Sequence, residues 1–145
     1  MKATMLLADA AQTVGGKLYI LGGGWTICGP APALMAVAIK LEVPADQAGR
    51  AHDWSLTLLD DNGELVLLEA LNGQRLPVEI SGKFEATLVP ELPQDMPLDL
   101  PLAVTIGPLP LEPGSRFVWQ LSIDGHAAEE WRLAFWTRPA RPAAK

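Results

Sequence analysis

Apolar and polar residues alternate along most of this chain, and this spacing is the strongest constraint on its fold. In MAVAIKLEV, residues 35–43, every second residue is a large apolar one, and the residues between them include Lys40 and Glu42. A period of two places the large side chains on one face of a β-strand. The segment therefore predicts a strand with one buried face.

The same period recurs in segments separated by thirteen prolines and thirteen glycines, as turns between short strands require. Only PADQAGRA, residues 44–51, favours a helical turn, which is too short to connect parallel strands. We therefore expect an all-β, mainly antiparallel fold of about 8–9 strands. Two packed sheets or a small barrel would satisfy this pattern, and we favour a two-sheet β-sandwich, immunoglobulin-like or related. The expected strands, besides 35–43, cover residues 4–8, 17–21, 54–58, 84–88, 100–106, 117–123 and 131–135.

The chain of 145 residues has the length of one domain. We expect this domain at residues 1–137, followed by a flexible Pro/Ala-rich tail at residues 138–145, RPARPAAK. Residues 90–99, PELPQDMPLD, carry three prolines and predict an extended loop within the domain.

Charge and cysteine content narrow the partners and the compartment. The formal net charge is −6 and no run of basic residues is present, so we expect no binding to nucleic acid or to an anionic membrane surface. Cys28 is the only cysteine, which excludes an internal disulfide and favours a cytoplasmic location. We expect no signal peptide, because the apolar segment at residues 3–8 is too short.

The glycine-rich stretch KLYILGGGWTICGPAP, residues 17–32, is the one segment that resembles a phosphate-binding loop. Such loops open a helix whose N-terminus holds the phosphate. Trp25 and the residues after it are β-branched or broken by Pro30, so no helix is expected there. We interpret Gly22–Gly24 as a bend, a bulge or a crossing between sheets, or as a point where another backbone comes close.

The first hairpin expected from the pattern contains DGH, residues 124–126. A two-residue turn at Asp124-Gly125 is one solution. A three-residue loop instead pairs Trp119 with Trp131 and keeps the large apolar side chains on one face, so we favour it.

The second hairpin surrounds DNG, residues 61–63. A loop at these positions pairs Leu58 with Val66 and Leu56 with Leu68. The outer face then carries three leucines, namely Leu59, Leu65 and Leu67. A hydrophobic patch of this kind needs a cover.

No residue pattern predicts catalysis or metal binding. The two histidines, His52 and His126, and Cys28 lie in different segments, whereas a zinc site needs three or four converging ligands. The acidic stretch DDNGE, residues 60–64, fits a hairpin turn better than a calcium loop. We therefore expect no enzymatic activity, no cofactor and no metal ion.

Trp136 has the opposite parity to the tryptophans expected in the core and shares the outer face with Arg132. Exposed Trp and Arg are frequent anchors for a partner or a sugar. The alternative is that the Trp136 ring covers the bare backbone of Gly114 across the strand pair. The sequence leaves both interpretations open.

Three segments resemble a known family: LLADAAQ, then GKLYILGGGW, and later PLEPGSRFVWQLSIDG. Together they are similar to an uncharacterised bacterial family of short, single-domain β proteins with an ADAAQ and GKLYILGGGW signature. The resemblance implies a small immunoglobulin-like or related β-sandwich, and it carries no activity.

We expect a non-catalytic binding or assembly module that acts through contacts with a protein partner or with itself. The expected interaction surface consists of Leu59, Leu65, Leu67, Arg132 and Trp136. One alternative is a sandwich that binds a glycan or a small anion through Trp136 and Arg132. Another is a structural subunit of a phage or injection particle.

Overall fold

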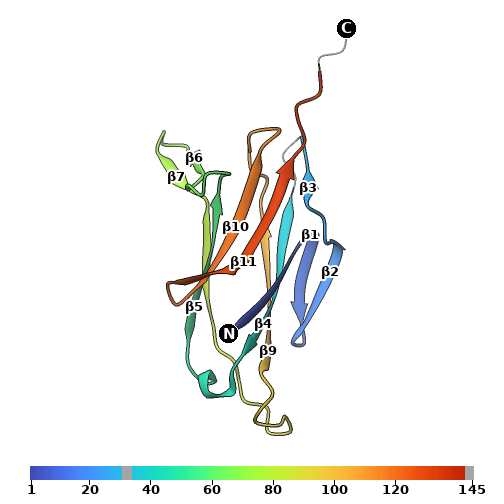
Figure 1. Cartoon of the computed structure of the whole chain (residues 1–145), viewed down its shortest axis with the longest axis vertical. Helices are drawn as coiled ribbons and strands as arrows, with labels where there is room; N and C mark the ends of the chain where they lie inside the picture. Colours follow the sequence, from blue (N-terminus) through green and yellow to red (C-terminus); the bar gives the residue numbers. More distant parts are fainter. Residues whose placement is uncertain (31–33, 143–145) are drawn as a thin grey trace.

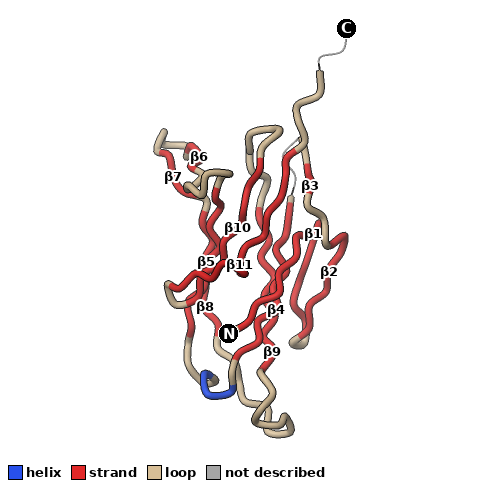
Figure 2. Tube along the Cα trace, viewed as in Figure 1, coloured by secondary structure: helices blue, strands red, loops and turns tan. Residues whose placement is uncertain are grey.

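The computed structural model describes residues 1–30 and 34–142, whose regular structure is almost entirely β-strand (Figures 1 and 2). The expectation of an all-β fold is confirmed. The helical turn expected within residues 44–51 is the 3-10 helix η1, Ala45–Gln47. In this described part, no helix is long and apolar enough to cross a membrane.

Most strands belong to two curled sheets, and a hairpin forms a third (Figure 1). The four-stranded sheet has the order β2 (Lys17–Gly23), β1 (Lys2–Val14), β4 (Met35–Val43) and β9 (Leu98–Ile106). The five-stranded sheet has the order β3 (Ile27–Cys28), β11 (His126–Thr137), β10 (Arg116–Ile123), β5 (His52–Leu59) and β8 (Glu79–Phe84). The two-stranded sheet joins β6 (Leu67–Glu69) to β7 (Arg75–Pro77). The short β3–β11 pair is parallel, and the other pairs of the described strands are antiparallel.

One hydrophobic core receives side chains from both large sheets. The alternating residues of MAVAIKLEV supply it from β4, and Trp119 and Leu121 supply it from β10. Trp119 is completely buried. Burial of one large apolar side chain contributes about 1.5–3 kcal/mol to folding. The alternation in the sequence places many such side chains in the core, and their burial is the main source of stability.

Strand β1 bends along its length (Figure 1) and pairs with two other strands, the two ladders meeting at Ala8. Its first half pairs with β4, and its second half pairs with β2. The resulting β1–β2 hairpin curls until β2 contacts β4 and β9, which are not its neighbours in the sheet. Ala36 and Ala38 point away from the core but are buried all the same.

The glycines of the GGG stretch let the chain cross from one sheet to the other. Strand β2 lies in the four-stranded sheet, whereas β3, four residues later, lies in the five-stranded sheet. Gly22 and Gly24 have φ angles of +61° and +92°, a region that favours glycine. A Cβ atom on Gly22 would collide with the Asp9 carboxylate. The sheet crossing is confirmed, and a close approach at Gly22 accompanies it.

The hairpin between β10 and β11 differs from the expected register. Its loop contains only two residues, Asp124 and Gly125, with φ angles of +51° and +76°, so the favoured three-residue loop was wrong. Trp119 lies opposite Leu133 rather than Trp131. The reason is a bulge in β11, where residues 128–131 lie opposite a single residue of β10. The bulge returns the large apolar residues of β11 to the core side.

The side chain of Gln120 satisfies the backbone of this bulge. Gln120 is buried, and its Nε2 donates to the carbonyl oxygens of Leu121, Ala128 and Trp131 at 3.0, 3.0 and 3.2 Å. Its Oε1 accepts a 2.6 Å hydrogen bond from Nε of Arg132. Carbonyl groups that a regular ladder would have paired are therefore hydrogen-bonded by one amide.

The hairpin around DNG begins as expected and then separates. Leu59 bridges Leu65, and the Asp60 carboxylate accepts hydrogen bonds from the backbone N–H groups of Asn62 and Glu64. The expected pairing of Leu56 with Leu68 is wrong, because Leu56 pairs with Ile80 of β8. β8 places Ile80 and Phe84 on the core side of β5, whereas β6 turns away to pair with β7.

The end of β8 and the start of the C-terminal tail differ from the expected boundaries. The strand expected at residues 84–88 is wrong beyond Phe84, because the partner strand β5 begins opposite it at His52 and the ladder between them ends there. The N–H of Arg138 donates to the carbonyl of Cys28 at 2.8 Å, so pairing with β3 reaches one residue into the expected tail. Residues 143–145 of that tail lie outside the described residues.

His52 connects three segments at one end of the molecule. Its Nδ1 donates to the Asp124 carboxylate at 2.7 Å, its Nε2 lies 3.2 Å from the carbonyl oxygen of Gln47, and its ring stacks on Phe84. Both partners are acceptors, so the imidazolium, with two N–H groups, satisfies the geometry best. The hydrogen bond to Asp124 raises the pKa of His52, and the same bond lowers the pKa of Asp124.

We expect Gln120→Met to lower the free energy of unfolding by about 2–3 kcal/mol, because Met has a similar shape but cannot donate to the carbonyls of the bulge. Urea denaturation followed by tryptophan fluorescence measures this change. Ser122→Ala, on the same face of β10, is the matched control, with an expected change within about 0.5 kcal/mol. Equal effects of the two substitutions would contradict the role of Gln120.

We expect the contribution of His52 to stability to depend on pH. The raised pKa of His52 means that this contribution is full below its ordinary value of 6.5 and is lost as the pH rises through the folded-state pKa. The lowered pKa of Asp124 means that its contribution is full above 3.8 and is lost only in stronger acid. The difference in unfolding free energy between wild type and His52→Gln should therefore be largest between these two values.

This difference should amount to about 1 kcal/mol, because Asp124 is half exposed and solvent screens the pair. Urea denaturation from pH 5 to pH 9 measures it. His126→Gln, at the exposed first residue of β11, is the control. A His52→Gln difference that does not change with pH would refute the charged pair.

Candidate functional site

The surroundings of Cys28 give no sign of an activated thiol. Cys28 is half-buried and lines a pocket of about 300 Å³ together with Asp9, Trp25 and Arg138. Burial raises the pKa of the thiol, and the nearby Arg138 only partly opposes this shift. A protonated thiol is a weak nucleophile. In the described part of the chain, no three His, Cys, Asp or Glu side chains gather as a metal site would require.

A polar depression of about 370 Å³ lies on the outer face of the five-stranded sheet. Its floor is made of small residues of β5, β8 and β10, including Ser55, Ser81 and Ser122. At its rim, Nζ of Lys83 donates to the Asp53 carboxylate at 2.6 Å, which raises the pKa of Lys83. Both charged groups are exposed and already paired with each other.

The leucines expected to form an interaction surface are brought together only in part. Leu59 is half-buried on β5 and bridges Leu65, which is 51% exposed. Leu67 is also exposed but belongs to β6, where it pairs with Pro77 in the separate hairpin. These three leucines therefore span the point at which the chain leaves the five-stranded sheet.

Trp136 and Arg132 lie on the outer face of β11, as their parity indicated. Trp136 is 43% exposed and lies opposite Arg116. The interpretation that its ring covers Gly114 is wrong, since the bulge shifts the register and Gly114 faces Pro139 instead. The Nε of Arg132 donates a hydrogen bond to Oε1 of Gln120, so the guanidinium helps to hold the side chain that fills the bulge.

One apolar surface that sequence reasoning missed is the outer face of the β1–β2 hairpin. Tyr19 and Leu21 of β2 are 52% and 72% exposed. Ala10 and Gln12 of β1 pair with them and share their face. A pocket of about 460 Å³ lies over these residues. The run LYIL contains no polar residue, which is a signal for this surface, but only the strand order shows that it lies at an edge.

The free edge of β2 differs from the other sheet edges of the described structure. Edge strands normally carry a proline, charged residues or few residues, which hinders pairing with another chain. β9 contains Pro101 and Asp99, and β8 contains Glu79 and Lys83. β3 has only two residues. β2 has neither proline nor charge between Lys17 and its end at Gly23.

A second apolar surface that sequence reasoning missed lies at the opposite end from the chain's C-terminus, in the loop between β8 and β9 (Figure 1). Leu88, Val89 and Met96 are exposed there and line a pocket of about 300 Å³. The prolines of PELPQDMPLD indicated an extended loop. The loop instead folds back on itself, with the N–H of Leu92 donating to the carbonyl of Val89 at 3.0 Å.

Comparison with known proteins gives one match. No curated protein and no solved structure matches the chain significantly. A family model described as a family of unknown function, DUF6941, matches residues 3–135, which include both large sheets except for the first residue of β1 and the last two of β11. The chain therefore belongs to the family of unknown function DUF6941.

Proposed function

We propose that the chain is a non-catalytic, cytoplasmic binding or assembly module that acts through protein–protein contacts at the edge strand β2. In this proposal the two large sheets form a β-sandwich of immunoglobulin-like or related type. The single cysteine supports a reducing compartment. The observation that carries the proposal is the free, apolar edge of β2 next to the exposed face of its hairpin.

Strand addition at an edge combines two kinds of contact. The unpaired N–H and C=O groups of β2 can form ladder hydrogen bonds with an incoming strand, and Tyr19 and Leu21 can pack against its side chains. An antiparallel second copy centred on Ile20 would place Tyr19 opposite Leu21 of the partner copy and Lys17 opposite Gly23, so no like charges meet. The edge is therefore self-complementary.

The apolar face makes this contact energetically reasonable. Association costs about 4–15 kcal/mol of translational and rotational freedom. Burial of one large apolar side chain contributes about 1.5–3 kcal/mol. Tyr19, Leu21 and the 54% exposed Val14, doubled by symmetry, would contribute at most about 9–18 kcal/mol on full burial, which is comparable to this cost. We expect association in the micromolar range.

A glycan- or anion-binding role at Trp136 and Arg132 has less support. A planar guanidinium binds anions best when its donors are free. Arg132 already donates its Nε to the buried Gln120 amide at 2.6 Å. Trp136 alone offers one exposed ring, beside Arg116.

We expect wild-type chain to form dimers at micromolar concentrations in sedimentation velocity, and Leu21→Lys to weaken this association at least tenfold. The added charge would be desolvated in the new strand pair, which costs more than the lost leucine contact. Leu71→Lys, at the fully exposed tip between β6 and β7, is the matched control and should dimerise like wild type.

A further variant separates the two candidate surfaces. Leu65→Glu alters the surface of Leu59, Leu65 and Leu67 and should leave the dimer intact. A wild-type monomer throughout the micromolar range would sink the assembly proposal. Weakening by Leu65→Glu without weakening by Leu21→Lys would move the contact away from β2.

A further inference from the structure

Backbone hydrogen bonds fix the shape of the pocket in the β8–β9 loop. Two backbone turns shape it, in which Leu92 N–H donates to the Val89 carbonyl and Met96 N–H donates to the Pro93 carbonyl, each at 3.0 Å. Ala45 of η1 forms another wall. The N–H of Gly49 donates to the carbonyl of Ala86 at 2.9 Å and connects the segment after η1 to the start of the β8–β9 loop.

The floor and rim of this pocket have different chemistry. Leu88, Val89 and Met96 present apolar surface, with 61%, 48% and 48% of each residue exposed. The lining that these residues share has no acidic side chain, but three exposed acidic residues, here called the acidic rim, each lie next to a lining residue in the sequence, namely Asp46, Glu91 and Asp95. Within the described residues, no ion pair neutralises any of the three. An occupant that carries both apolar groups and positive charge would complement this surface.

Arg50 is the nearest cation along the chain to η1, and it acts elsewhere. Its charge favours the ionised form of Asp124 and opposes the charged form of His52. Lys40 pairs with Asp99 at 3.4 Å. The acidic rim therefore lacks a cationic partner of its own in the described structure.

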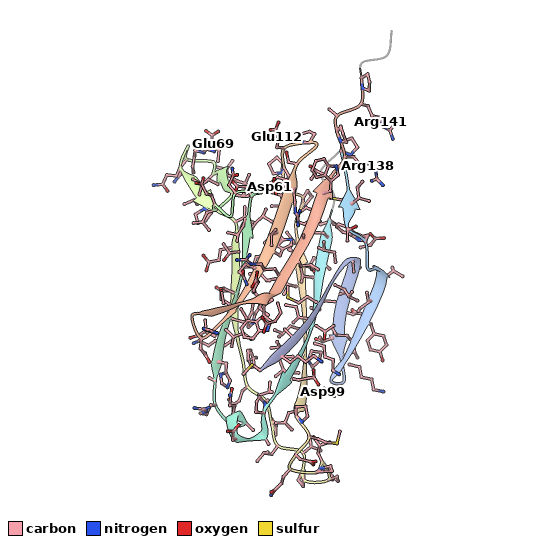
Figure 3. The ribbon with its side chains drawn as sticks, in the orientation of Figure 1. Asp61, Glu69, Asp99, Glu112, Arg138 and Arg141 are labelled. Carbon is pink, nitrogen blue, oxygen red and sulfur yellow. The ribbon has the colours of Figure 1, made fainter. Side chains whose placement is uncertain are left out.

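The chain itself contains a segment with the required chemistry. After Arg138 and Pro139, which contact Gly29 and Gly114, the sequence continues as ARPAAK, residues 140–145. Arg141 and Pro142 are exposed, and Arg141 points away from the body of the molecule (Figure 3). Proline-containing segments adopt an extended conformation at low entropic cost.

This segment cannot reach the pocket of its own molecule through its described residues. The tail leaves at one end of the molecule, and the β8–β9 loop lies at the other (Figure 1). β9 alone, with nine residues, spans about 30 Å between these ends. Residues 140–142 extend at most about 10 Å. Residues 140–142 can therefore contact this pocket only in a second molecule.

We infer that the acidic, apolar pocket of the β8–β9 loop binds the Arg141–Pro142 segment of a second copy, which joins molecules end to end. Pro142 fills the apolar floor beside Met96, and the guanidinium of Arg141 lies over the rim near Asp95. This contact uses neither β2 nor its hairpin, so it is separate from the proposed function. It combines with a β2 dimer to extend an assembly in a second direction.

The test uses the full chain carrying Leu21→Lys, which removes the β2 contact, and Arg141→Glu, which removes the chain's own tail as a competitor. An N-acetylated peptide of residues 139–145, PARPAAK, is titrated into this protein by calorimetry. We expect saturable one-to-one binding that weakens as salt rises. Adding Met96→Lys should weaken it at least tenfold, and adding Leu71→Lys should leave it unchanged.

A charge exchange provides the second arm. Asp95→Lys should weaken binding of the natural peptide and strengthen binding of a peptide with Arg141→Glu. No saturable binding, or binding that is indifferent to both Met96→Lys and Asp95→Lys, overturns the inference. Because β2 is disabled in every sample, these outcomes say nothing about the dimer, whose own test is the sedimentation of Leu21→Lys.

Discussion

The structure depends on one constraint, which is that two curled sheets must place their alternate side chains in the same core. Trp119, Leu58 and Ile39 come from different strands of both sheets, and all three are completely buried. Where strand geometry would turn large residues away from this core, the backbone changes instead. The bulge in β11 is such a departure from regular pairing, and it keeps Trp131 and Phe135 on the core side.

Features that follow regular strand pairing were predictable from the sequence, whereas features that depend on a bulge or on competition between strands were not. Alternation identified the strand at 35–43 correctly, because period-two spacing has a single structural meaning there. The register of β10 and β11 was not predictable, because the apolar pattern favoured a three-residue loop and nothing in it marks the bulge that Gln120 fills beside a two-residue turn. The partner of Leu56 depended on competition between β6 and β8, and nothing local in either sequence ranks them.

The candidate surfaces were harder to predict than the core. A run such as LYIL indicates a strand, but its exposure depends on whether another strand lies beside it. The leucines around Leu65 looked like a continuous patch because the hairpin was expected to continue, and the early departure of β6 divides them. Trp136 was placed on the correct face, although its cross-strand neighbour changed with the bulge.

The glycine-rich crossing between the sheets has a consequence for how the molecule opens. The N–H of Gly24 donates to the carbonyl of Leu7 in the four-stranded sheet. Two residues after Gly24, the carbonyl of Thr26 accepts a hydrogen bond from the N–H of Trp136 in the five-stranded sheet. A short covalent connector bonded to both sheets couples their fluctuations, since neither sheet can separate without breaking these bonds. Amide hydrogens on β1 and β11 should therefore exchange with solvent in one cooperative event, so that the two sheets behave as a single unit of unfolding.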